Sequence, residues 1–154
     1  MIYKYWTALV FLAVLAQVAG AAYGGFYSSD KLGDQSGTDT QNRITEKTFD
    51  HGFGFHNGFG YAIFLGSVVL FLLALGARVG RPRIWWNLAL PVMVAVQIVL
   101  AWISEAVPVV GIFHGLNALA IFLLSGLLSH RAFREHRAPA VAPATASAPP
   151  ATDA

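Results

Sequence analysis

Residues 55–67 read FHNGFGYAIFLGS, and residues 113–125 read FHGLNALAIFLLS. The two stretches share seven identities in thirteen positions, and each places a histidine, His56 or His114, at the start of a long apolar run. Ionisable residues are rare in membrane-spanning helices and usually mark a functional site when they occur there. The recurrence therefore predicts two equivalent helices that each present an imidazole.

Charged side chains avoid four windows of the chain, at 5–29, 51–77, 84–104 and 106–130. Of the 154 residues, 56% are hydrophobic and 12% are charged, about half the charged share of an ordinary soluble domain. At 1.5 Å per residue, each window can cross a hydrocarbon core of about 30 Å. We therefore predict an all-α, four-helix transmembrane bundle. Its spans are expected near 5–27, 56–78, 85–107 and 111–132.

The polar segments set the expected domain organisation and orientation. We expect a membrane domain at 1–137 that includes an extracytoplasmic loop at 28–55, followed by a disordered Ala/Pro-rich cytoplasmic tail at 138–154. Seven of the ten Lys and Arg residues lie near the N-terminus, in the 78–83 turn or after the fourth span. The positive-inside rule then places both termini in the cytoplasm. The net charge of +2 is spread over loops and does not indicate nucleic-acid binding.

The first span has two interpretations, a retained membrane helix or a cleaved signal peptide. Its Gln17 lies in VLAQVAGA, and the third span repeats the pattern with Gln97 in VAVQIVLA. Together with the histidine repeat, these glutamines predict a tandem duplication of a two-helix unit. Each unit would comprise a helix with a central Gln and a helix opened by Phe-His. A chance match between apolar helices is the alternative.

The absence of cysteine excludes disulfides, iron–sulfur clusters and thiol chemistry, and leaves histidine as the strong nitrogen ligand. Two imidazoles on parallel helices can hold a planar cofactor between them, and haem b is the natural candidate. We predict His56 and His114 as its metal ligands, with small residues making room and residues on the same helix faces lining the site. The predicted lining residues are Gly60, Ala118, Ile63, Ile121, Ser67 and Ser125. No catalytic residue is predicted.

Other interpretations of the histidines remain open. His51 and Glu105 could join His56 and His114 to gather copper or another transition metal, or to handle protons. The histidines could instead cap helix ends or pair with glutamine. In that case the protein would be a non-catalytic accessory subunit of a larger membrane complex, with Gln and Gly residues serving helix association.

The segments FHNGFG at 55–60 and FHGLNAL at 113–119 resemble the repeated motif of small bacterial four-span membrane proteins of unassigned function. This resemblance covers about residues 5–132 and implies a location in the bacterial inner membrane. More remotely, the chain is similar to haem A synthase and cytochrome b561, whose parallel helices present axial histidines. That similarity implies axial ligation by His56 and His114 and a cytochrome b-like role in electron transport. Those families carry more His residues or more than one pair, so haem modification is not implied. Expected partners are membrane lipid, other membrane subunits and a quinone or similar redox partner.

Overall fold

The computed structural model describes residues 2–33 and 41–135, and the elements in these ranges are helical. They are α1 (Ile2–Gly33), α2 (Gln41–Gly76), α3 (Arg81–Ala106), the short 3-10 helix η1 (Pro108–Val110) and α4 (Gly111–Glu135). The four long helices are each long and apolar enough to cross a membrane. The predicted four-span, all-α bundle is confirmed, and the chain is a multi-pass membrane protein.

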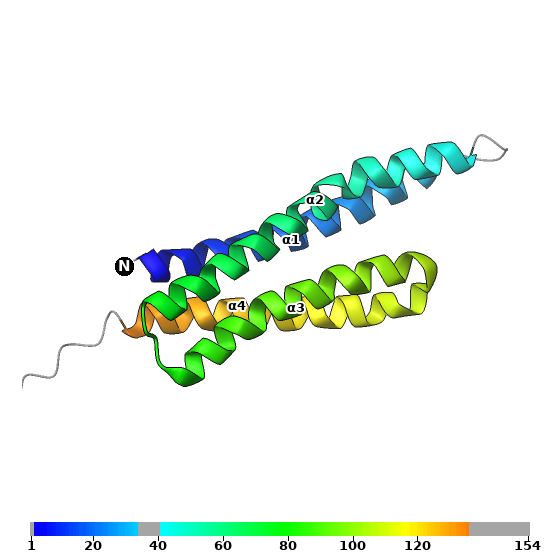
Figure 1. Ribbon diagram of the computed structural model, residues 1–154. Helices are drawn as coiled ribbons and strands as arrows, with labels where there is room; N and C mark the ends of the chain where they lie inside the picture. Colours follow the sequence, from blue (N-terminus) through cyan, green and yellow to red (C-terminus); the bar gives the residue numbers. More distant parts are fainter. Residues whose placement is uncertain (1, 34–40, 136–154) are drawn as a thin grey trace, which may run out of the picture.

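The helices form two antiparallel hairpins, α1–α2 and α3–α4, that lie against each other (Figure 1). Among the described residues, α1 packs on α2 and α4, and α3 packs on the same two helices. Helices α2 and α4 therefore lie diagonally across the bundle. The start of α1, the α2–α3 turn and the end of α4 share one end of the molecule, and the α1–α2 hairpin extends further at the other end (Figure 1).

The polar loop expected at 28–55 is much shorter than predicted. Residues 28–33 and 41–55 are helical, so only 34–40 separate the two described helices. The reason is close packing: a Cβ atom at Gly52 would lie 3.0 Å from the carbonyl oxygen of Gly24, and the ring of Phe53 lies beside Gly24. Two helices this close, with no proline between them, continue past the predicted membrane boundary. The tail expected at 138–154 lies outside the described residues.

The predicted duplication is visible in which residues are buried. An offset of 80 residues relates three buried residues of α1 to three of α3, namely Thr7 to Asn87, Val10 to Leu90 and Val14 to Val94. An offset of 58 relates four buried residues of α2 to four of α4, namely Ile63 to Ile121, Ser67 to Ser125, Leu70 to Leu128 and Ala74 to Ala132. Such a match requires the same helix faces to point inward, so the two hairpins are structural copies around a shared core.

Polar contacts tie the helices together at the end that holds the α2–α3 turn. The fully buried Asn87 donates to the hydroxyl of Tyr3 at 3.0 Å and to the backbone oxygen of Arg83 at 2.8 Å. The Arg83 side chain forms an ion pair with Glu135 at the end of α4. These contacts connect α1, α3 and α4 at this end.

Candidate functional site

The first histidine forms a reciprocal pair with the glutamine of the preceding helix. Gln17 Nε2 of α1 donates to the backbone oxygen of His56 at 2.7 Å. In return, Nδ1 of His56 lies 3.1 Å from the backbone oxygen of Gln17. Two hydrogen bonds therefore link α1 and α2 at one level, and we call this pair of residues the first clamp.

The second histidine makes the same contacts in the second hairpin. Gln97 Nε2 of α3 donates to the backbone oxygen of His114 at 3.0 Å, and His114 Nδ1 lies 3.2 Å from the backbone oxygen of Gln97. We call these two residues the second clamp. Residues in the first clamp are 39 positions apart and those in the second are 17 apart, because the first hairpin is longer. Identical contacts across different spacings support the duplication and argue against a chance match of glutamines.

Each clamp determines which imidazole nitrogen carries the proton. A backbone carbonyl can only accept a hydrogen bond, so Nδ1 of each histidine must be the donor. In the neutral ring, Nε2 is then left with a free lone pair. Such a bond through Nδ1 is the usual way in which proteins orient a metal-binding histidine.

The two histidines meet although their helices are diagonal. Both side chains are half-buried, and their ring centroids lie 6.4 Å apart with an angle of 61° between the ring planes. Among the described residues, neither Nε2 has a hydrogen-bonding partner in the protein. The arrangement therefore brings two ring nitrogens without hydrogen-bond partners among the described residues, one from each of two equivalent helices, to one place inside the bundle.

The predicted lining residues fall into two groups. Ile63, Ile121, Ser67 and Ser125 are buried core residues on the faces that carry the histidines. The serine hydroxyls donate to the backbone oxygens of Phe64 at 2.7 Å and Phe122 at 3.0 Å, within their own helices. Because both hydroxyls are hydrogen-bonded within their own helices, the buried region beyond the histidines is apolar.

The two small residues predicted to line the site, Gly60 and Ala118, have different surroundings. A Cβ atom at Gly60 would lie 3.4 Å from Gln17 Nε2, which is an ordinary contact distance, so Gly60 lies against the glutamine of the first clamp. Ala118 of α4 is half-buried. The structure therefore gives Gly60 a role next to the clamp, one turn beyond His56.

His51 and Glu105 do not join the histidine pair. Both are exposed, and the His51 ring lies against Tyr27 with centroids 5.1 Å apart. Residues 2–33 and 41–135 contain no group of three or more His, Cys, Asp or Glu side chains placed to hold a metal ion. The four-residue metal cluster considered from the sequence is not assembled there.

Asn117 is the site residue that sequence reasoning missed. Its Nδ2 donates to Gln97 Oε1 at 2.7 Å and to the backbone oxygen of Met93 at 2.9 Å. The signal was available, because Asn117 is a polar amide in an apolar span, one turn after His114. Its equivalent in the first copy is Phe59, and there Gln17 Oε1 is buried without a hydrogen-bond partner among the described residues.

Comparison with known proteins gives one match. Residues 48–105 match a family of unknown function, DUF6220. The matched segment covers most of α2 and nearly all of α3, and so includes His56 and Gln97 but not their partners. No curated protein and no solved structure matches the chain. The comparisons therefore support a relationship to a family without an assigned function, and none to haem A synthase or cytochrome b561.

Proposed function

We propose that the protein binds one haem b between His56 and His114 and serves as an electron-transfer subunit. The observation that carries this proposal is the pair of clamps. Each holds Nδ1 of a histidine on a backbone oxygen and leaves Nε2 free, and the two rings come within 6.4 Å of each other.

The spacing of the rings suits two ligands on one metal. Metal–imidazole bonds are about 2.0 Å long, and a ring centroid lies about 1 Å from its nitrogens, so two opposed imidazoles on one metal have centroids about 6 Å apart. The observed centroid distance of 6.4 Å is close to this value. The donor set fits iron in haem, for which histidine is a standard axial ligand.

The surrounding residues favour electron transfer over reaction with substrate. A haem held by His56 and His114 would supply a one-electron redox couple. The clamps fix both rings, while the buried Ile63 and Ile121 keep the region beyond them apolar. Buried hydrophobic surroundings of this kind exclude water and tune a redox potential.

The proposal includes a location and partners. The basic residues near the α2–α3 turn and the chain ends favour cytoplasmic termini in a bacterial inner membrane. The histidines would then lie toward the outer face. A quinone or another membrane subunit would exchange electrons with the site.

One alternative has a specific observation in its favour. Both clamps also hydrogen-bond one helix to the next, so they would strengthen helix association even with no cofactor present. The protein would then be a non-catalytic accessory subunit of a membrane complex.

Absorption spectroscopy separates these functions. We expect protein purified from haem-supplied cells to show a Soret band and, after dithionite reduction, sharp α and β bands. His56→Ala and His114→Ala should each lose the low-spin spectrum, while His51→Ala, which changes an exposed histidine, should keep it. A helical but colourless protein would overturn the haem proposal and favour the accessory role.

A further inference from the structure

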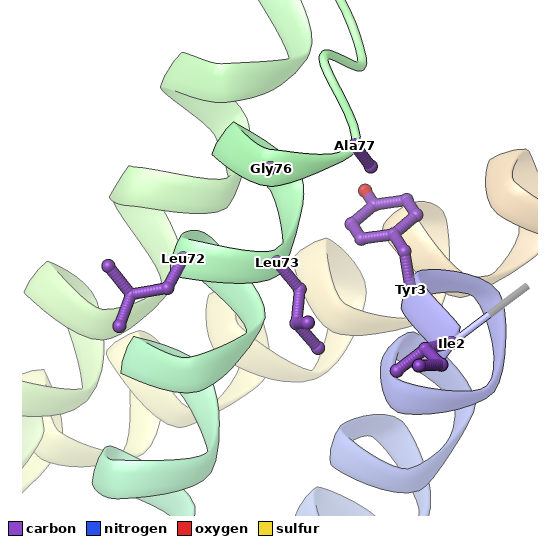
Figure 2. A pocket seen from close by; sticks show the side chains of 6 residues that line it. All are labelled: Ile2, Tyr3, Leu72, Leu73, Gly76 and Ala77. Atoms are coloured by element: carbon purple, nitrogen blue, oxygen red, sulfur yellow. The ribbon is translucent and has the colours of Figure 1, made fainter.

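A groove lies between the start of α1 and the end of α2, at the end of the bundle that holds the α2–α3 turn. It has a volume of about 420 Å³ and is lined by Ile2, Tyr3, Leu72, Leu73, Gly76 and Ala77. Figure 2 shows the α2 residues on one side of the groove and the two α1 residues on the other. Ile2 and Leu72 are strongly exposed, so the groove opens toward the surroundings of the bundle.

The charges at this end are almost all positive. The described residues near it include one carboxylate, Glu135, and several basic side chains: Lys4, Arg78, Arg81, Arg83, Arg131 and Arg134. Glu135 forms an ion pair with Arg83, and the Lys4 ammonium lies over the rings of Tyr5 and Phe133. Neither Arg78 nor Arg81, which follow the groove residue Ala77 in the chain, has an ion-pair partner among residues 2–33 and 41–135.

The backbone of Arg78 is unusual. Its φ is +50°, which makes it the one non-glycine residue with a positive φ in the described part of the chain. The left-handed position that follows a helix is normally occupied by glycine, which adopts it without a steric penalty. An arginine there is strained, and such strain commonly marks a functional position.

We propose that this groove binds an anionic phospholipid, with one acyl chain between α1 and α2 and its phosphate at Arg78 and Arg81. The apolar side chains that line the groove can contact a hydrocarbon chain, and the guanidinium groups of Arg78 and Arg81 can bind a negatively charged headgroup. Anionic lipids are concentrated in the cytoplasmic leaflet, where basic residues at the membrane surface attract them. The site is independent of the histidines, so it stands or falls apart from haem binding.

The test compares phosphatidylglycerol with phosphatidylcholine of the same chain length on the full-length protein, by native mass spectrometry of the lipid retained from mixed nanodiscs. Wild type should retain phosphatidylglycerol preferentially. Arg78→Gly should reduce this preference about fivefold, the value expected for one surface charge, yet leave thermal stability equal or higher because glycine relieves the strained backbone. Arg78→Lys should keep most of the preference. A purely structural role for Arg78 predicts unchanged lipid preference in Arg78→Gly, and that result would overturn the headgroup assignment.

A second variant tests the groove itself. A Cβ atom at Gly76 would meet nothing within 4 Å, so a side chain there starts in open space, and Gly76→Phe adds bulk at a residue that lines the groove. We expect it to lower retention of both lipids, with the helix content unchanged by circular dichroism. Inorganic phosphate at millimolar concentration should neither bind nor compete, because the acyl chain contributes to affinity. Undiminished lipid retention in Gly76→Phe, or full competition by phosphate, would refute the site.

Discussion

The two clamps are copies that differ in a single partner. In the second clamp, Gln97 donates to His114 and accepts from Asn117, so both ends of its amide are hydrogen-bonded. In the first clamp, Gln17 donates to His56, but its Oε1 is buried with no partner among the described residues. A buried polar atom without a partner costs about 1–3 kcal/mol. The second hairpin should therefore be the more firmly held half of the site.

The hairpins also differ in length, and the extra length has its own packing. The α1–α2 hairpin extends beyond the α3–α4 hairpin (Figure 1), and its extension is held by the close contact of Gly24 with Gly52. The helices of the α3–α4 hairpin are instead joined by a short connection that contains η1. The second hairpin thus combines a fully bonded clamp with a tight turn, whereas the first combines an incomplete clamp with a long extension.

Removing the glutamine side chains should give the largest difference between the copies. Gln97→Ala deletes two hydrogen bonds and leaves Asn117 with one of its two acceptors, so we expect a loss of about 2 kcal/mol in the free energy of unfolding. Gln17→Ala deletes one hydrogen bond and also removes the unpartnered Oε1, so its cost should be less than about 1 kcal/mol. Unfolding in mixed micelles of increasing SDS content, followed by circular dichroism, measures both. Equal losses would show that the copies are equivalent.

Adding a methyl group in the extension of the α1–α2 hairpin should have the next largest effect on the free energy of unfolding. At Gly52, an added methyl group would lie 3.0 Å from Gly24 O and 3.3 Å from Gly24 Cα, and neither backbone atom can move aside without shifting the helix. We expect Gly52→Ala to cost about 1.5 kcal/mol through this overpacking. Gly54→Ala is the matched control, since a Cβ atom there meets nothing within 4 Å. If the two variants unfold alike, the extension is not held by the glycine contact.

The sequence predicted the four spans and the repeated histidines, because charge-free length and the spacing of identical residues are properties of one helix at a time. It also paired each histidine with the correct preceding helix. It did not predict the helical extension, because the contact of Gly24 with Gly52 depends on how two helices cross. It missed Asn117 for a similar reason: the partner, Gln97 Oε1, lies on another helix.

Placing a hydrogen-bond donor near Gln17 Oε1 in the first clamp should have the smallest effect on the free energy of unfolding. It is also the most direct test of the difference between the two clamps. Phe59→Asn places an amide one turn after His56, where its counterpart Asn117 reaches the glutamine at 2.7 Å. The variant loses the stacking of Phe59 on Phe55, whose centroids are 4.8 Å apart, and Phe59→Leu measures a large part of that packing loss without supplying a donor. A double-mutant cycle with Gln17→Ala isolates the new hydrogen bond, for which we expect about 0.5 kcal/mol, the usual size of such bonds between membrane helices. Coupling in the Phe59→Asn cycle but not in the Phe59→Leu cycle would mean that the first clamp lacks only this donor. Absence of coupling in both would mean that the copies differ in helix placement as well as in sequence.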